Sequence, residues 1–207
     1  SYSLGHVTVD PRNPDVVWLG TGENISNRSV GYGDGVYRSN DGGETWLNMG
    51  LRDSQHIGKI IVDPSDSRIV YVAAEGPLWS AGGDRGLYKT IDGGSTWKAV
   101  LQISEDTGIT DIAMDPRDSS VIYASSFQRR RRVGQLIGGG PESAIYKTSD
   151  GGQTWSKLTK GIPSVDKGRI ALAVSPQRPD VVYALITAAG KEGGFFRSAD
   201  RGETWVR

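Results

Sequence analysis

The sequence predicts an all-β fold built from four tandem repeats, each holding four short antiparallel strands. One eight-residue motif, Ser/Thr-x-Asp-x-Gly-x-Thr-Trp, carries this prediction. It occupies residues 39–46, 90–97, 148–155 and 198–205. Its tryptophans lie 51, 58 and 50 residues apart. The composition agrees, because 29 glycines and a hydrophobic content of only 36% suit short strands joined by tight turns rather than large helices.

The sequence around each motif repeats as well, and it gives the four strands, A to D, in order. Strand A ends in Asp-Pro or Ser-Pro, at residues 10–11, 63–64, 115–116 and 175–176. Strand B is an apolar run at residues 16–19, 69–72, 121–124 and 181–184. Strand C alternates just before the motif, at residues 35–38, 86–89, 144–147 and 194–197. Strand D begins at the motif tryptophan, so the motif forms the C–D turn.

The motif has a local structural mechanism. The Ser or Thr hydroxyl and the Asp carboxylate can accept N–H groups of the turn, and the glycines permit positive φ. The tryptophan ring is expected to be buried at the junction of two repeats. Because the same residues recur in every repeat, we interpret them as structural rather than catalytic or calcium-binding. They are Asp41, Trp46, Asp92, Trp97, Asp150, Trp155, Asp200 and Trp205.

Four antiparallel strands in about 50 residues predict one blade of a β-propeller. The blades are expected at residues 1–50, 51–102, 103–161 and 162–207. The chain begins at strand A and ends just inside strand D, so no strand is left to be shared between the first and last blades. We therefore expect a partial propeller, completed by further blades or by a second copy of the chain.

The motif resembles the Asp-box, or bacterial neuraminidase repeat, of sialidases, xyloglucan-cleaving endoglucanases, a photosystem assembly factor and sortilin-type propellers. The phrases Val-Asp-Pro, Gly-Thr-Gly-Glu and Gly-Gly-Glu-Thr-Trp look most like bacterial secreted proteins labelled sortilin-like or glycosyl-hydrolase-like. The resemblance implies a propeller in a secreted or cell-envelope protein. It does not fix an activity, because the shared residues are the structural ones. The arginine and Tyr-Glu motifs of sialidases are not found.

Function is expected on the face that carries the B–C loops, because these connections vary while the strands do not. The loops span residues 21–34, 74–85, 125–143 and 187–193. The candidate ligand-binding residues in them are Glu23, Arg28, Glu75, Trp79, Arg129 and Arg131. Equivalent positions at the start of strand A add His6, Lys59 and Asp111.

Each candidate allows two interpretations. Glu23 and Glu75 follow strand B and are the only catalytic candidates, as an acid–base pair on a glycosidic bond; alternatively they pair with arginines or accept loop N–H groups. Trp79 stacks on a sugar or peptide, or caps a hydrophobic corner. The run of four arginines at residues 129–132 binds anionic groups, or forms a solvated loop paired with loop acids.

Composition excludes several classes. With 24 basic and 24 acidic residues, no global field attracts nucleic acid. There are no cysteines, and two histidines without ligand spacing do not predict a metal site or any cofactor. No apolar run is long enough to insert in a membrane. We expect a non-catalytic module that binds a peptide or glycan; the alternatives are part of a glycoside hydrolase, or a pure scaffold.

Overall fold

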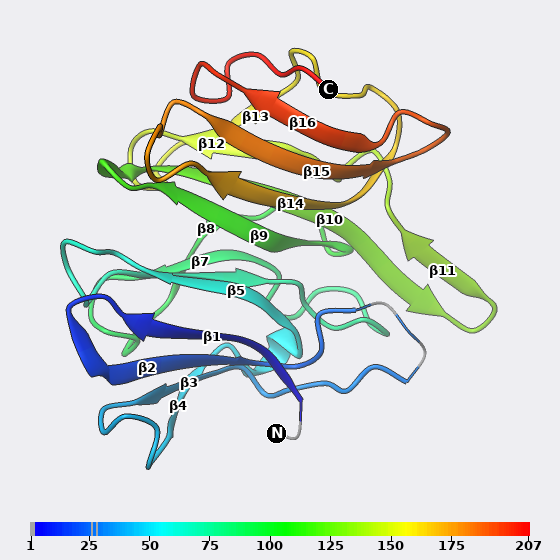
Figure 1. The fold of residues 1–207 in the computed structure, drawn as a ribbon. Helices are drawn as coiled ribbons and strands as arrows, with labels where there is room; N and C mark the ends of the chain where they lie inside the picture. Colours follow the sequence, from blue (N-terminus) through cyan, green and yellow to red (C-terminus); the bar gives the residue numbers. More distant parts are fainter. Residues whose placement is uncertain (1–2, 26, 28) are drawn as a thin grey trace.

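The computed structural model describes residues 3–25, 27 and 29–207, and these residues form an all-β fold of four antiparallel sheets (Figure 1). The one helical element, η1 (Arg52–Ser54), is a single 3₁₀ turn. The sheets follow one another in chain order, with the first and fourth at opposite ends of the row (Figure 1). Their first strands meet in sequence, β1 against β5, β5 against β9 and β9 against β14.

The strands match the predicted repeat. Sheet 1 contains β1 (Leu4–Asp10), β2 (Asn13–Thr21), β3 (Val36–Ser39) and β4 (Leu47–Gly50). Sheet 2 contains β5 (Ile57–Val62), β6 (Val70–Ala74), β7 (Gly86–Thr90) and β8 (Lys98–Leu101). Sheet 3 contains β9 (Thr107–Asp115), β10 (Asp118–Arg132), β11 (Gln135–Gly138), β12 (Ile145–Thr148) and β13 (Ser156–Leu158). Sheet 4 contains β14 (Lys167–Val174), β15 (Val182–Ala188) and β16 (Gly194–Ser198), and a single bridge between Arg197 and Val206 stands where the others have a fourth strand.

The expected third B–C loop is wrong in part, because residues 129–138 form a β-hairpin rather than a loop. Strand β10 continues through the arginine run and pairs with β11, with Arg129 opposite Gly138 and Arg132 opposite Gln135. The turn between them uses Gly134 at a φ of 78°. The four consecutive arginines at residues 129–132 do not alternate between apolar and polar side chains. The sequence therefore does not indicate a strand here.

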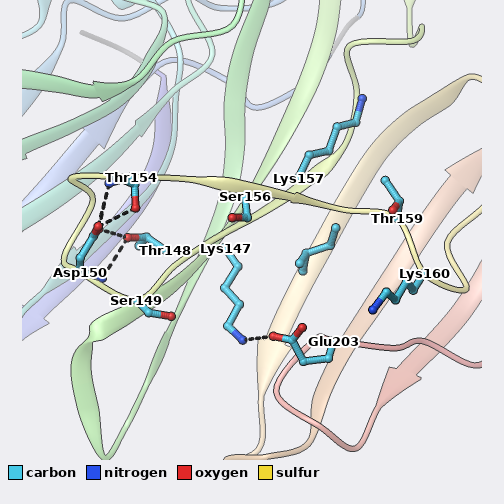
Figure 2. Close-up of a pocket in the computed structure, with 11 residues that line it drawn as sticks. Lys147, Thr148, Ser149, Asp150, Thr154, Ser156, Lys157, Thr159, Lys160 and Glu203 are labelled. Atoms are coloured by element: carbon cyan, nitrogen blue, oxygen red, sulfur yellow. Dashed lines mark hydrogen bonds and ion pairs between the residues drawn. The ribbon is translucent and has the colours of Figure 1, made fainter.

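The four motif turns have the predicted internal hydrogen bonds. In the third turn, the Thr148 hydroxyl accepts the Gly152 N–H at 3.0 Å, and Asp150 accepts the Thr154 N–H at 2.9 Å and the Thr154 hydroxyl at 2.6 Å (Figure 2). The first, second and fourth turns repeat this pattern. Each of the four aspartates thus accepts hydrogen bonds within its own turn, and their structural role stays a prediction.

The motif turns lie on the same face as the A–B turns. In each sheet a backbone N–H of the motif turn donates to a carbonyl next to the A–B turn. The four bonds are Gly42 to Asp15, Gly93 to Arg68, Gly151 to Ser120, and Arg201 to Asp180. The B–C connections consequently occupy the other face of the molecule.

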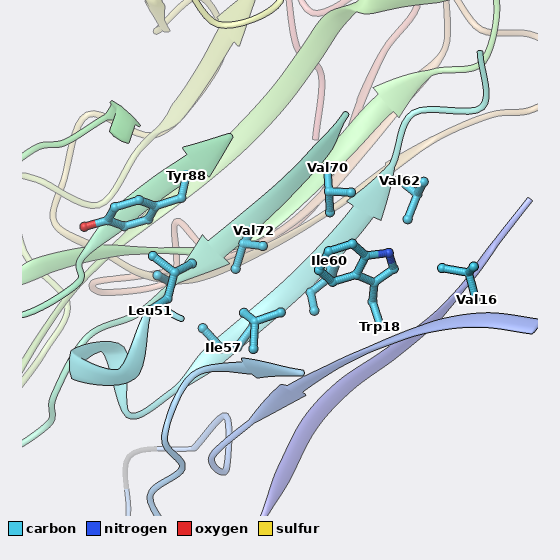
Figure 3. Close-up of a cluster of buried hydrophobic side chains, with 11 residues drawn as sticks. Val16, Trp18, Leu51, Ile57, Ile60, Val62, Val70, Val72 and Tyr88 are labelled. Carbon is cyan, nitrogen blue, oxygen red and sulfur yellow. The ribbon is translucent and has the colours of Figure 1, made fainter. Parts of the chain in front are cut away.

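Adjacent sheets pack through apolar side chains, and three clusters fill the three junctions. Trp18 from sheet 1 lies among Ile57, Ile60 and Val62 from sheet 2 (Figure 3). Two further clusters join sheets 2 and 3, and sheets 3 and 4. Trp97, Trp155 and Trp205 pack into these clusters as expected. Trp46 does not, and 36% of it is exposed, because no sheet precedes the first one in the structure.

A second contact ties the second, third and fourth motif turns to the sheet before each of them. The Gly93 carbonyl accepts a hydrogen bond from Arg38 at 3.1 Å. The Gly151 carbonyl accepts two, from the Tyr71 hydroxyl at 3.1 Å and from Lys89 at 2.9 Å. The Arg201 carbonyl accepts the Tyr123 hydroxyl at 2.8 Å. We call this contact the interblade clamp, because it joins sheets that share no β-ladder.

The motif turns predict how stability depends on pH. Hydrogen bonds from Ser39 and Thr45 lower the pKa of Asp41, and those from Thr90 and Thr96 lower the pKa of Asp92, each from 3.8 to about 2. A carboxyl with a lower pKa in the folded state contributes stability that is complete above the unfolded pKa and is lost as pH falls through the folded one. We expect the melting temperature to be constant from pH 6 to 5 and to fall steeply between pH 4 and 2.

Asp92→Asn should lower the melting temperature at pH 7 and flatten this acid limb. Glu44→Gln is the matched control, because Glu44 is an exposed acid in a motif turn whose side chain makes none of the turn's bonds. An acid limb unchanged by Asp92→Asn would show that these carboxylates do not hold the turns.

Candidate functional site

The first strands of the four sheets bring the predicted strand-start residues to one place. The Nδ1 atom of His6 accepts the Ile60 N–H at 3.3 Å, and Lys59 Nζ lies 2.9 Å from Asp111 Oδ1. Asp111 Oδ2 accepts the Leu172 N–H at 2.8 Å. Each side chain thus reaches the first strand of the next sheet. Burial and the nearby Lys59 charge lower the pKa of His6 below 6.5, although Asp111 opposes this shift.

A cavity of about 230 Å³ opens beside these residues. It is lined by Asn24 from the first B–C loop and by residues near the starts of three inner strands, namely Gly58, Thr110, Asp111, Arg169, Ile170 and Ala171. The lining combines an amide, a hydroxyl, a carboxylate and a guanidinium with small apolar groups. This mixture suits a neutral polar ligand that offers both donors and acceptors.

Glu75 stands at the centre of a buried charge network next to this cavity. Its Oε1 atom accepts hydrogen bonds from the Thr110 hydroxyl at 2.8 Å and from Arg169 at 2.9 Å. Its Oε2 atom lies 2.7 Å from Arg129 Nη1, at ion-pair distance but outside hydrogen-bond geometry. Glu75 and Arg129 are both buried. Of the two interpretations for Glu75, pairing with arginines describes the geometry.

The buried arginines hold loops in place. Arg129 donates to the Ile25 carbonyl at 3.0 Å and to the Gly76 carbonyl at 3.3 Å. Arg85 donates to the carbonyls of Glu75, Pro77, Ser80 and Gly82. Burial and the charge of Arg129 lower the pKa of Arg85 to about 10, so it stays protonated at neutral pH. Burial, together with Arg129, also lowers the pKa of His56 to about 4, so this histidine is neutral.

Arg169 was not predicted from the sequence, although it connects the first loop to the network. It donates to the side-chain oxygen of Asn24 at 2.5 Å and to the Asn24 carbonyl, and its guanidinium lies 5.5 Å from the Phe127 ring. The sequence does contain a signal for this residue, because Arg169 departs from the repeat. At the same distance before the proline that ends strand A, the other repeats have Leu4, Ile57 and Ile109. A charge in place of an aliphatic residue marks a break in the repeat.

Trp79 and Arg131 form an exposed platform on the B–C face. The Arg131 guanidinium lies 5.8 Å from the Trp79 ring, and 49% of Trp79 is exposed. The backbone supports the pair, because the Arg131 N–H donates to the Leu78 carbonyl at 2.8 Å. Half of the Trp79 side chain is thus open to solvent, which favours the stacking interpretation. A flat ring fixed in this way can stack on a ligand.

The other arginines of the run divide by face, because side chains alternate along a strand. Arg129 is buried in the network above and is not open to a ligand, whereas Arg132 is exposed. Arg130 lies 2.5 Å from Asp106. The run is therefore a strand rather than a loop, and two of its arginines pair with loop acids, Arg129 with Glu75 and Arg130 with Asp106.

The Glu23 carboxylate accepts the Gly31 N–H at 3.0 Å. This contact fits the second interpretation of Glu23, in which the side chain accepts N–H groups of its own loop. Its carbonyl lies 2.8 Å from Nδ1 of His56. Arg28, also a candidate, lies outside the described residues. Within the described part of the chain, no group of three His, Cys, Asp or Glu side chains is placed to hold a metal ion.

A hollow of about 380 Å³ lies on the opposite face, between the third and fourth motif turns (Figure 2). Two of its charged groups are engaged in the motif turns themselves, since Asp150 accepts hydrogen bonds within its own turn and Lys147 pairs with Glu203 at 2.8 Å. We therefore place the candidate site on the B–C face.

Comparison with known proteins assigns the chain to a family. A model described as Sortilin-Vps10 (sortilin, neurotensin receptor 3) matches residues 34–162, more than half of the chain. The chain belongs to the Sortilin-Vps10 family. The expected relationship to sortilin-like and glycoside-hydrolase-like propeller proteins is therefore confirmed at this level.

Curated relatives of this Sortilin-Vps10 member are xyloglucanases. A xyloglucanase from a Paenibacillus species is 29% identical over 169 residues, covering 73% of this chain and 16% of the relative. The oligoxyloglucan-reducing end-specific xyloglucanase of Emericella nidulans is 25% identical over 219 residues, covering all of this chain and 24% of the relative. The chain thus spans less than a quarter of the length of these two enzymes.

Solved structures agree on the fold. An ancestral GH74 enzyme superposes with a TM-score of 0.73 at 21% identity, covering 99% of this chain and 24% of that one. The GH74 xyloglucanase of Xanthomonas campestris gives 0.71 at 21% identity, covering 97% of this chain and 29% of that one. No helix among the described residues has the length and apolar character needed to cross a membrane.

The geometry predicts that Glu75 contributes strongly to the stability of the fold. Glu75→Gln removes the carboxylate that pairs with buried Arg129, and loss of one partner of a buried ion pair costs roughly 3–5 kcal/mol. We expect the free energy of unfolding, measured in urea, to fall by about 3 kcal/mol. Glu105→Gln, at an exposed acid, is the control and should change it little. Equal stability of the two variants would contradict the network.

Proposed function

We propose that the chain is a section of an Asp-box propeller whose B–C face binds a glycan, within a glycoside-hydrolase-like protein. In this proposal each sheet is one blade, with blades at residues 1–50, 51–102, 103–161 and 162–207, and the motif turns are Asp-boxes. The ring is completed from outside these four blades. The turn hydrogen bonds and the repeated packing of neighbouring sheets support this architecture.

The observation that carries the glycan proposal is the Trp79–Arg131 platform. Sugar rings have apolar faces that stack on indoles, and their hydroxyls need donors and acceptors nearby. Asn24, Thr110 and Arg169 offer such groups at the central cavity on the same face. The relatives are named as enzymes that act on xyloglucan, a neutral glycan. A peptide ligand, the other expectation, stays a prediction.

We propose further that these residues bind without cleaving. Glycosidases use two carboxyl groups on either side of the bond. Glu75 is buried and paired with two arginines, and Glu23 holds its own loop. Any hydrolysis by the complete protein would then take its carboxyl groups from other segments. From the resemblance to secreted glycoside-hydrolase-like proteins, we also propose that the protein is located outside the cytoplasm, in the cell envelope or the medium.

Binding of a xyloglucan oligosaccharide, followed by calorimetry, tests the glycan proposal. Trp79→Ala should weaken binding about tenfold, equivalent to about 1.4 kcal/mol, while Trp79→Phe keeps most of the affinity. Ile91→Ala, an exposed apolar residue in the second motif turn on the opposite face, is the control. Affinity unchanged by Trp79→Ala would contradict the proposal, and release of reducing sugar that stops in Glu23→Gln would favour hydrolysis instead.

A further inference from the structure

A lysine is buried at the junction of sheets 3 and 4 without an acidic partner. Lys167 begins β14, and only 7% of it is exposed. Its Nζ atom donates to the Pro163 carbonyl at 3.0 Å and to the Val165 carbonyl at 2.9 Å. An ammonium group has three N–H donors, and no carboxylate in the described part of the chain lies at ion-pair distance from this one. Because a charged side chain is rarely buried without an opposite charge, this ammonium group indicates a missing anionic partner.

The charge of Lys167 is not part of the repeat. At the same distance before the proline that ends strand A, the second and third repeats have Gln55 and Thr107. Thr107 is fully buried, and its hydroxyl donates to the Glu142 carboxylate. The third sheet thus has a neutral residue, with a partner of its own, where the fourth has a cation. The fold therefore does not require an ammonium group at this position.

Lys167 lines a cavity of about 370 Å³ between the end of sheet 3 and the connection that leads into sheet 4. The polar residues of the lining are Lys157, Thr159, Ser164 and Lys167, and none of the lining residues is acidic. The apolar residues of the lining are Pro141, Leu158, Ile162 and Pro163. Leu158 and Ile162 pack against the apolar cluster that joins sheets 3 and 4. The cavity thus combines two cations and two hydroxyls with an apolar floor.

The two lysines make the cavity electropositive. Lys157 is exposed, and its Nζ atom makes only a long contact, of 3.4 Å, with the Pro141 carbonyl. Burial and the charge of Lys157 lower the pKa of Lys167 below 10.5, although Asp166 opposes this shift. An anion between the two ammonium groups would offset both the burial of one and the repulsion between them.

The connection at residues 159–166 is held in place by backbone hydrogen bonds. The Ile162 N–H donates to the Thr159 carbonyl at 3.2 Å, and the Ala189 N–H donates to the Asp166 carbonyl at 2.9 Å. These bonds lie near the two ends of the connection. A cavity whose wall is already ordered binds a ligand with little further loss of conformational entropy.

We propose that this cavity binds a small molecule that carries a carboxylate. The carboxylate oxygens pair with Lys167 and Lys157, and the body of the ligand covers Leu158 and Ile162. The two hydroxyls of the lining serve polar substituents of the ligand. The cavity shares no lining residue with the central cavity and contains neither residue of the exposed platform. This site and the proposed glycan site can therefore be tested, and can fail, independently.

Calorimetric titration of the chain at pH 7 with glucuronate and with benzoate tests the proposal. Glucose and benzamide are their uncharged counterparts. We expect at least one acid to bind, and its counterpart to bind at least about tenfold more weakly, because a hydrogen bond to a charged group is stronger than one to a neutral group. Binding of glucuronate identifies an acidic sugar as the ligand class, and binding of benzoate an apolar acid. The inference is overturned if neither acid binds with a Kd below about 10 mM, or if the uncharged counterparts bind equally well.

Lysine variants show whether the acid binds in this cavity. Lys167→Met removes the ammonium group at nearly the same side-chain length and should weaken binding of the acid at least about tenfold. Lys157→Met should weaken it as well, and since Lys157 is exposed this variant keeps its fold, which circular dichroism checks. Lys191→Met, at an exposed lysine outside the cavity, is the control and should bind like the unmodified chain. Acid binding that survives both cavity variants, or that is lost in Trp79→Ala instead, would overturn the inference.

Discussion

The second, third and fourth motif turns each hold a backbone carbonyl that a side chain of the preceding sheet reaches, and the assembly of the sheets depends on this contact. The turn must first be rigid, which the Thr or Ser hydroxyl and the Asp carboxylate achieve by accepting its N–H groups. Its outward carbonyl is then fixed in space. Tyr71 and Lys89 donate to one such carbonyl, and Tyr123 donates to the next. The apolar clusters lie beneath these contacts, so polar and apolar interactions set the same spacing between sheets.

On the other face, which carries the B–C connections, ion pairs hold the sheets together. Inner strands from different sheets share no ladder, and the pairs formed by Lys59 with Asp111 and by Arg169 with Glu75 connect them there instead. Three guanidinium groups surround Glu75, and backbone carbonyls satisfy most of their donors. This network holds the B–C connections in place, and Trp79 is exposed on one of these connections. The two carboxylates that looked catalytic in the sequence, Glu23 and Glu75, make contacts that hold loops here, and the proposed binding surface lies beside them.

Much of the fold follows from the sequence, because the motif, the proline and the apolar runs recur in register and each has a local mechanism. The strands, the turns and the shared face of the motif and A–B turns could all be predicted. The hairpin at residues 129–138 could not, since arginines carry no hydrophobic period. The pairing of Glu75 with Arg129 and Arg169 joins three repeats, and one sequence does not reveal contacts between distant side chains. The exposure of Trp46 depends on its place at the end of the row.

The repeat supplies its own control for the claim that the interblade clamp joins the sheets. Tyr71, Tyr123 and Tyr183 occupy equivalent positions, but only the first two reach a following motif turn. The free energy of unfolding should be measured for Tyr→Phe at each of the three positions. The account predicts a loss of about 1 kcal/mol for Tyr71→Phe and Tyr123→Phe, from the missing hydrogen bond, and almost none for Tyr183→Phe. Equal losses at all three positions, or none at any, would contradict it.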